Sequence, residues 1–239
     1  MSDPYIIFNG VKSTEVAGIG VIMQQLPTFE RPTRIVSFDQ VPGRDGRLEQ
    51  DDEVYDAYST SMKVNCNGVD LRDVYAWLSG SGWLISSDEP DRAVWASLYM
   101  QMKGTRFRAG ACFDSITVPV YCQPFRYFYP QPAPLSIITS PGLIENPGTI
   151  RSAPIITIKG TGNVSVMLGQ YQMDFEDLTD GIIVDCEAEE CFSLDGAQLL
   201  NGLVDMDEFP KLMPGANYVQ WLGEGTITEM LIDRRCRDL

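Results

Sequence analysis

The chain has 239 residues, of which 44% are hydrophobic, and carries 18 Lys and Arg against 33 Asp and Glu, a net charge of −15. This composition is typical of a globular protein with one large domain or two smaller ones. The negative charge opposes binding to nucleic acids and anionic membranes, because both kinds of binding depend on basic side chains. The sequence has no histidine, which excludes Ser-His-Asp and Cys-His catalysis, HExxH zinc chemistry and histidine-ligated iron or copper. The composition therefore favours a binding or structural protein over an enzyme.

No targeting or metal-binding segment is predicted. The N-terminus lacks a basic region followed by an apolar run, so we expect no signal peptide, and no apolar stretch is long enough to span a membrane. The cysteines contain no CxxC pair, and the single short spacing between Cys186 and Cys191 does not make a zinc site. We therefore expect no metal or cofactor and unpaired thiols in a protein that folds in the cytoplasm. The six cysteines are Cys66, Cys112, Cys122, Cys186, Cys191 and Cys236.

Strand patterns dominate the first half of the chain. The β-rich segment Tyr5–Phe8 is followed by Asn9-Gly10, a strong signal for a two-residue hairpin. A long polar loop, residues 40–58, is expected between the predicted strands Arg34–Phe38 and Ser61–Val64. Pro119 places the predicted strand Ser115–Tyr121 at a sheet edge or a bulge. The other predicted strands are Arg34–Phe38, Ser61–Val64 and Ser115–Tyr121.

One amphipathic helix is predicted within Val69–Gly80. Asp70 precedes it as a candidate N-cap, and Gly80-Ser81-Gly82 ends it. A weaker helical pattern covers Arg92–Leu98. The apolar residues of the first helix recur at the spacing of one helical face, which we expect to lie on the sheet: Leu71, Val74, Tyr75 and Leu78.

A domain boundary is predicted in the segment 129–134, which has three prolines in five residues and favours a stiff, extended spacer. Residues 1–134 hold 12 basic and 16 acidic side chains, whereas residues 135–239 hold 6 and 17. Turn residues punctuate the second part at intervals near ten residues, which is typical of an antiparallel sandwich. Its predicted strands are Pro154–Lys159, Asn163–Leu168, Gly181–Cys186, Asn217–Leu222 and Thr226–Ile232.

The segment Gly160-Thr-Gly162 resembles the start of a dinucleotide-binding fingerprint. It lacks the third glycine and joins two predicted strands, whereas the fingerprint joins a strand to a helix. We therefore predict that this segment is a hairpin turn.

Two acidic clusters lie in the second half. The first is predicted to be a solvated loop, because Thr179 stands where an EF-hand loop requires glycine. The second contains Asp185, Glu187 and Glu189, which would share one face of a strand, as on a solvent-facing side; a glycosidase carboxylate pair is the alternative there. The clusters are Asp174, Glu176, Asp177 and Asp180, and Asp185, Glu187, Glu189 and Glu190.

Aromatic residues gather in residues 125–129, where the first domain ends. A stacking platform for a ligand is conceivable, but packing where the chain leaves the sheet is the preferred interpretation. The four tryptophans are scattered along the sequence and form no ladder for a polysaccharide.

Taken in order, these segments resemble the distal tail proteins (Dit) of long-tailed bacteriophages, a component of the baseplate hub. The resemblance covers nearly the whole chain and rests on the joint order and spacing of motifs that are weak singly. The motifs are FNG (8–10), VPGRDG (41–46), WLSGSGWLISSDEPDR (77–92), VYCQPFRY (120–127), ENPGT (145–149), the unit from Ala153 to Asn163, and LMPGAN (212–217).

The resemblance implies a mainly β fold of two antiparallel β-sandwich domains. The first, residues 1–134, would carry one helix and a projecting arm and form a hexameric ring. The second, residues 135–239, would be a galectin-like sandwich that points outward. The ring would join the tail tube to the tail-associated fibre or lysin protein, with the tape-measure protein and receptor-binding proteins as further partners. This implies a non-enzymatic structural protein at the virion tail tip, made in the host cytoplasm.

The long polar loop is the candidate arm. Gly43 and Gly46 permit tight turns, and Arg44 and Arg47, which flank Asp45, are expected to meet acids on a neighbouring copy. A closed ring needs such an arm to meet a different patch on the next copy. The alternative is a mobile surface loop.

Two other functions remain open from the sequence. The C-terminal domain is the candidate carbohydrate-binding module, with Trp221 as the stacking residue. Galectins use a histidine in their sugar site and this chain has none, so lectin activity does not follow from the resemblance. The third function is a glycosidase that uses carboxylates between Asp185 and Glu190.

Overall fold

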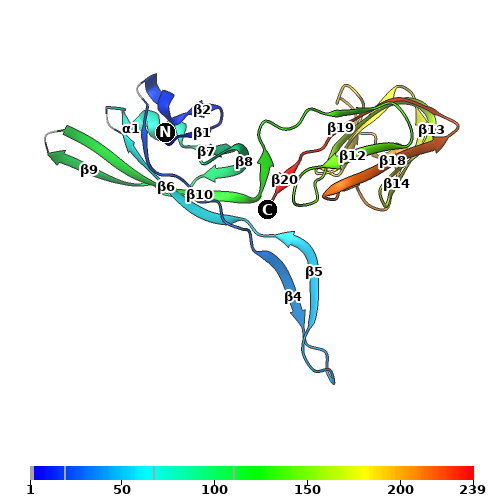
Figure 1. Cartoon of the computed structure of the whole chain (residues 1–239), viewed down its shortest axis with the longest axis horizontal. Helices are drawn as coiled ribbons and strands as arrows, with labels where there is room; N and C mark the ends of the chain where they lie inside the picture. Colours follow the sequence, from blue (N-terminus) through cyan, green and yellow to red (C-terminus); the bar gives the residue numbers. More distant parts are fainter. Residues whose placement is uncertain (1–2, 19, 67, 110) are drawn as a thin grey trace. The chain divides into compact units, whose positions relative to one another are not determined.

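The computed structural model describes residues 3–18, 20–66, 68–109 and 111–239. It contains two compact units, residues 1–129 with Leu239 (unit 1) and residues 130–238 (unit 2), which are described separately (Figure 1). Both are built from curled antiparallel sheets, and the described residues contain one α-helix. The predicted mainly β fold class with a single helix is confirmed, and the curled sheets are consistent with β-sandwiches.

Unit 1 is one curled sheet in the order β2-β1-β7-β8-β10-β6-β3, and β9 pairs with the first part of β10. The inward side chains form a single core, in which Phe8, Met62 and Ile116 are completely buried. Its elements are β1 (Ile6–Phe8), β2 (Val11–Lys12), the 3₁₀ segment η1 (Ser13–Gly18), β3 (Ile22–Gln25), β4 (Arg34–Asp39), β5 (Leu48–Tyr55), β6 (Tyr58–Cys66), α1 (Leu71–Trp77), β7 (Gly80–Ser86), β8 (Glu89–Leu98), β9 (Lys103–Ala109) and β10 (Ala111–Phe128).

The helix α1 begins where the sequence predicted. The Asp70 carboxylate accepts a hydrogen bond from the Arg72 amide at 2.9 Å, which satisfies one free donor of the first turn. Val74 and Leu78 are completely buried in the core, whereas Tyr75 is 40% exposed. Three of the four predicted positions therefore pack against the core, since Leu71 is partly buried there as well. The helix has seven residues within the predicted range Val69–Gly80.

Two local strand predictions have physical explanations in unit 1. Asn9 and Gly10 both have positive φ, as a two-residue turn between β1 and β2 requires. Pro119 falls between the part of β10 paired with β9, which ends at Thr117, and the part paired with β8, which begins at Tyr121. On this side of β10, residues 118–120 have no strand partner, so Pro119 does not need to donate a backbone hydrogen bond there.

Two predictions for unit 1 were wrong. Residues 40–58 are not one loop, because Leu48–Tyr55 forms strand β5 and pairs with β4 in a separate two-stranded sheet. The segment Arg92–Leu98 is not helical but belongs to β8, paired with both β7 and β10. In each case the segment forms a strand because it pairs with neighbouring strands, and this pairing outweighs the local preference of the sequence for a loop or a helix.

Unit 2 has two sheets that share the long strand β13. One runs β11-β19-β13-β15-β16 and the other β12-β18-β13-β14-β17. They curl around one core that includes the completely buried Ile156, Val166 and Val219 (Figure 1). The elements are β11 (Leu135–Ile137), β12 (Gly142–Asn146), β13 (Ile155–Leu168), β14 (Tyr171–Leu178), β15 (Gly181–Asp185), β16 (Glu190–Phe192), the 3₁₀ turn η2 (Asn201–Leu203), β17 (Val204–Asp205), β18 (Gly215–Gly223), β19 (Thr226–Asp233) and β20 (Arg237–Asp238).

The predicted hairpin at Gly160-Thr-Gly162 is wrong, because this segment is a bend inside β13. Before the bend the strand pairs with β15 and β19, and after it with β14 and β18. Gly162 has φ +82°, and the register shifts between Gly162 and Val164. The glycines therefore allow one strand to turn a corner and enter the second sheet.

Candidate functional site

The candidate arm is the hairpin β4–β5, which extends away from the sheet of unit 1 (Figure 1). At its base the Asp56 amide donates to the Thr33 carbonyl at 2.9 Å. Arg34 holds the stalk by an ion pair with Asp51 at 2.8 Å and a longer contact with Glu53 at 3.5 Å. The stalk is thus a two-stranded ribbon with a closed base and a register shift between Ile35 and Val36.

The arm residues that the sequence singled out form the tip between the two strands. Gly43 and Gly46 have φ +82°, and the Arg44 amide donates to the Val41 carbonyl at 3.2 Å in a turn. The five candidate contact residues are exposed. They are Gly43, Arg44, Asp45, Gly46 and Arg47.

Large apolar side chains are exposed on the stalk. Ile35 and Val54 face each other across the strands on one side, and Phe38 lies on the other side. Their exposed fractions are 51%, 49% and 54%. A two-stranded ribbon in water is marginally stable, and apolar residues on both of its faces are typical of a segment that binds another chain.

A second group of partly exposed apolar side chains lies on β7, β8 and β10. Trp83 is paired with Trp95 across the strands, and its ring centroid is 5.2 Å from those of Trp95 and Tyr127. Trp83 and Trp95 are 40% and 39% exposed. These rings meet edge to face and offer no flat stacking platform. The predicted aromatic cluster at the end of β10 is therefore engaged in contacts within unit 1, including that of Phe125 with Tyr55 at 5.7 Å.

Motifs that are far apart in the sequence contact each other in pairs. In unit 1 the Asn9 amide donates to the Trp83 carbonyl at 3.1 Å, and a Cβ on Gly82 would overlap the Asn9 side chain. In unit 2 the buried Asn146 donates to the Leu212 carbonyl at 3.0 Å and accepts from the Gly148 amide at 3.0 Å. The motifs 8–10 and 77–92, and likewise 145–149 and 212–217, hold the fold together.

The first acidic cluster is not the solvated loop that the sequence predicted. Asp174 and Glu176 lie within strand β14, which pairs with β13 and β17, and Asp180 lies in the turn before β15. Across the described ranges, no three cysteine or carboxylate side chains lie close enough together to hold a metal ion.

The prediction that the second acidic cluster shares one face of a strand was also wrong. Asp185 ends β15, and Glu187 and Glu189 lie in the turn that leads to β16. Arg235 binds Asp185 through two hydrogen bonds, of 2.8 and 3.0 Å, and Glu187 through a third of 3.0 Å.

The ion pair with Arg235 affects the pKa of Asp185 in the second cluster. Partial burial raises the pKa of Asp185, but the hydrogen bonds from Arg235 and from the amides of Ala188 and Glu187 outweigh it and lower the pKa. A glycosidase acid needs a raised pKa. The arrangement is therefore that of a structural ion pair.

The cysteine side chains that the structure describes are buried and form no disulfide with one another. Burial raises the pKa of Cys122 to about 12 and that of Cys191 to about 11. The side chain of Cys112 lies outside the described part of the chain. The thiols described are Cys66, Cys122, Cys186, Cys191 and Cys236.

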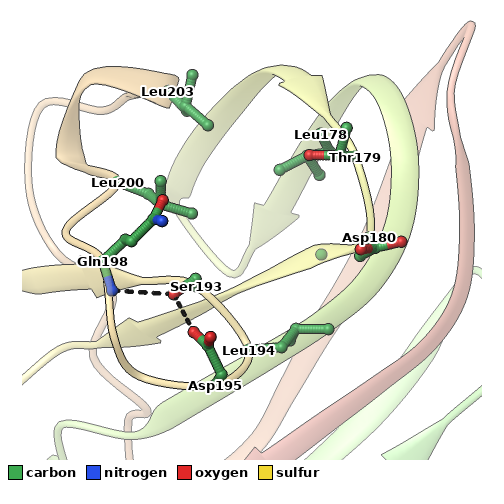
Figure 2. Close-up of a pocket in the computed structure, with 10 residues that line it drawn as sticks. Leu178, Thr179, Asp180, Ser193, Leu194, Asp195, Gln198, Leu200 and Leu203 are labelled. Atoms are coloured by element: carbon green, nitrogen blue, oxygen red, sulfur yellow. Dashed lines mark hydrogen bonds between the residues drawn. The ribbon is translucent and has the colours of Figure 1, made fainter.

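Unit 2 has a pocket of about 340 Å³ that sequence reasoning did not find (Figure 2). The turn from β14 to β15 forms one wall, with Thr179 and Asp180, and the segment 193–203 forms the other. On the second wall Ser193 donates to Asp195 at 2.5 Å and accepts from the Gln198 amide at 3.1 Å. Apolar side chains of four leucines complete the lining: Leu178, Leu194, Leu200 and Leu203.

Trp221 does not line this pocket. It lies on β18, is half-buried and packs against the core of unit 2. The Ser140 hydroxyl accepts a hydrogen bond from its amide at 3.0 Å. In the part of the chain that the structure describes, no helix is long and apolar enough to cross a membrane.

Comparison with solved structures shows what the fold is similar to. No family model and no curated protein sequence matches the chain. The fold is similar to the crystal structure of SPP1 Dit (gp 19.1), described as a paradigm of the hub adsorption apparatus in phages that infect Gram-positive bacteria. The TM-score is 0.68 at 16% sequence identity, and the likeness covers 97% of this chain and 98% of that one. The predicted resemblance to distal tail proteins is thus confirmed at the level of the fold, which the two chains share over nearly their whole length.

Proposed function

We propose that this chain is a structural component of a bacteriophage tail tip, a distal tail protein without catalytic activity. The observation that carries the proposal is the fold shared with SPP1 Dit over 97% of the chain. The motif order in the sequence supports it as well, because two pairs of those motifs, 8–10 with 77–92 and 145–149 with 212–217, contact each other within their units. The proposed location is the virion tail tip.

We propose that residues 1–134 form a ring of six copies and that residues 135–239 form an outward, galectin-like domain. A closed ring uses a heterologous interface, in which one patch of each copy meets a different patch of the next. The arm β4–β5 suits this role, because it leaves the sheet of unit 1 and exposes Ile35, Phe38 and Val54. The proposed partners are the tail tube, fibre or lysin, tape-measure and receptor-binding proteins, with no nucleic acid and no membrane insertion.

Electron microscopy and mass photometry of the purified chain test the ring. Six copies of a 26.6-kDa chain give about 160 kDa and an annulus with six-fold symmetry. A single species near 27 kDa at every concentration would contradict self-assembly.

A clean deletion tests the arm. Arg34 and Tyr55 form the first cross-strand pair of the stalk, and the Tyr55 ring contacts Phe125. Residues 35–54 can therefore be replaced by Asn-Gly, a two-residue turn that keeps this contact. The shortened chain should unfold at the same denaturant concentration as the full chain but stay monomeric. Rings of unchanged yield would show that the arm is not the ring contact.

Carbohydrate binding by residues 135–239 is the second candidate function, and the pocket of unit 2 is the observation that favours it. Thr179, Asp180 and Gln198 supply hydrogen-bonding groups beside leucine side chains, a combination that can bind a sugar ring. A glycan array with the whole chain tests it. Loss of a signal in Asp180→Ala but not in Trp221→Phe would place the sugar in the pocket, and the reverse would favour Trp221. An array without signal would exclude sugar binding by those glycans.

A further inference from the structure

The pocket of unit 2 has a carboxylate on each of its two walls. The turn from β14 to β15 contributes Asp180, and the segment 193–203 contributes Asp195 (Figure 2). The lining contains no basic side chain. Its volume of about 340 Å³ is at the small end of the range for ligand pockets. The pocket therefore suits a ligand of the size of one sugar unit.

The carboxylate of Asp195 is held in place by its own loop. It accepts hydrogen bonds from the Ser193 hydroxyl at 2.5 Å and from the Ala197 amide at 3.0 Å. The loop is closed by a bond from the Ser193 amide to the Gln198 carbonyl at 2.9 Å. The bonds to its carboxylate lower the pKa of Asp195, so the group stays ionised at neutral pH. A negative charge fixed in this way does not need to be ordered when a ligand binds.

The carboxylate of Asp180 is available to a ligand. Its backbone is fixed, because its carbonyl accepts from the Gly160 amide at 3.1 Å. Among the residues that the structure describes, no hydrogen bond or ion pair holds its side chain. Lys159, which pairs with Gly181 across the strands, binds Glu229 at 2.9 Å. The ammonium group of this lysine is therefore engaged with a different acid.

The charge of the C-terminal domain favours a positively charged ligand. Residues 135–239 hold 6 basic and 17 acidic side chains, a net charge of −11, and none of the basic ones lines the pocket. A field of this sign attracts cations and repels anionic ligands. Within the described residues no three cysteine or carboxylate side chains are placed to hold a metal ion. The charge and the lining together indicate an organic cation.

The leucine side chains of the pocket suit a ring with an apolar face. Leu194 is 37% exposed, and Leu200 and Leu203 are half-buried, so a ligand would remove apolar surface from water. Thr179 and Gln198 add hydrogen-bonding groups at the edge of this apolar surface (Figure 2). Sugar rings combine an apolar face with polar edges, and this lining matches both.

We propose that the pocket binds a sugar unit that carries a free ammonium group, as an unacetylated hexosamine does. The ammonium group is bound by the carboxylates of Asp180 and Asp195, and the ring packs on the leucine side chains. This inference rests on carbohydrate binding, the second candidate function, and names the class of sugar. Hydrogen bonds between ionised groups are stronger than those between neutral ones, so the ammonium group sets the preference among sugars of equal shape.

Three sugars that differ in one substituent test the preference. Methyl glycosides of glucosamine, glucose and N-acetylglucosamine carry an ammonium, a hydroxyl and a neutral amide group on the same ring carbon. Isothermal titration of the whole chain measures each affinity. Glucosamine should bind on the order of ten-fold more tightly than the other two. This advantage should shrink at high salt, because salt screens exposed charges.

Variants that remove one charge locate the ammonium group. Asp180→Asn and Asp195→Asn keep the size of the side chain, and each should lower the affinity for glucosamine about ten-fold without changing that for glucose. The Asp180 variant is the more decisive, because it leaves the hydrogen bonds of the 193–198 loop intact. Glu224→Gln is the matched control, an exposed acid between β18 and β19 that does not line the pocket. A loss of the same size in this control would trace the effect to net charge and overturn the assignment.

The outcomes separate this inference from carbohydrate binding itself. If the three sugars bind equally well, carbohydrate binding stands and the ammonium preference is wrong. If ethanolamine, which has an ammonium group but no ring, binds as tightly as glucosamine, the pocket recognises charge alone and the sugar assignment is wrong. If none of the sugars binds, this inference is wrong, and a glycan-array signal from other sugars would leave carbohydrate binding standing without it.

Discussion

Gly160 lies against the backbone of Thr226, so close that a Cβ on Gly160 would be 2.2 Å from the Thr226 carbonyl oxygen. The contact is where β13 leaves one sheet of unit 2 and enters the other. The neighbour is backbone and cannot rotate away as a side chain would. The close packing of β13 against β19 at this corner therefore requires glycine at position 160.

Gly160→Ala should destabilise unit 2 by roughly 2–3 kcal/mol, because the added methyl group forces the two strands apart. Urea unfolding, with hydrogen exchange to assign the loss to unit 2, measures the effect. Gly202→Ala is the matched control, since a Cβ on Gly202 would have no atom within 4 Å. A change below about 0.5 kcal/mol for Gly160→Ala would contradict the tight crossing.

Asn146→Ala should cost about 1–3 kcal/mol, because it leaves the Gly148 amide unpaired in the interior and removes one of the two hydrogen bonds that the Leu212 carbonyl accepts, the other coming from the Ser152 amide. The same unfolding measurement tests it. Asn163→Ala is the comparison, because Asn163 is exposed and accepts one bond, from the Asp177 amide at 2.8 Å. Its loss should be about 0.5–1 kcal/mol. Equal losses at both positions would show that burial does not set the cost.

The ion pair of Asp185 with Arg235 should make unit 2 sensitive to acid. Because the folded-state pKa of Asp185 is lowered, the pair stabilises the fold above the unfolded pKa of about 3.9, and this contribution is lost as the pH falls through the folded pKa. Asp185→Asn should cost about 1 kcal/mol at pH 7, after allowance for solvent screening, and progressively less as the pH falls below the unfolded pKa of about 3.9. Unfolding across a series of acidic pH values measures the difference; a loss that does not change with pH would mean that packing is responsible.

Cys122 and Cys191 should resist alkylation in the folded protein. Burial raises their pKa values to about 12 and about 11, so at pH 8 the reactive thiolate is rare, and access is blocked as well. Mass spectrometry after iodoacetamide treatment should find both unmodified in buffer and modified in urea. Modification of Cys122 within minutes in buffer would show that β10 opens locally.

Phe38→Asn should weaken the proposed ring roughly ten-fold while changing the free energy of unfolding by less than about 0.5 kcal/mol. The side chain is 54% exposed on the arm, so its burial would come only from a second copy. Leu222→Asn, at a 72% exposed apolar residue of unit 2, is the control and should assemble normally. If both variants assemble as the unaltered chain does, the arm is not buried in the ring.

Local chemistry accounts for the sequence predictions that succeeded. Asn9-Gly10 specifies its turn through positive φ, and Asp70 caps its helix through a bond to a residue two positions away. Both are decided within a few residues, so a sequence pattern contains the necessary information. The motif order likewise indicated the Dit fold that the structural comparison found.

The sequence predictions failed where pairing with another strand determines the conformation of a segment. Gly160-Thr-Gly162 has the composition of a turn, but β14, β15, β18 and β19 together bind both sides of the segment and keep it in one strand. Similarly, Leu48–Tyr55 becomes a strand because β4 pairs with it, although its acidic residues favour a loop.

The sequence by itself determined the mainly β class, the helix cap, the hairpin at Asn9 and the absence of histidine chemistry, because each depends on residue type and short spacing. Only the tertiary structure decided that β13 pairs in two sheets and that Arg235 binds Asp185. These relationships join residues dozens of positions apart. Their free energy comes from pairing and burial between strands, which no local pattern records.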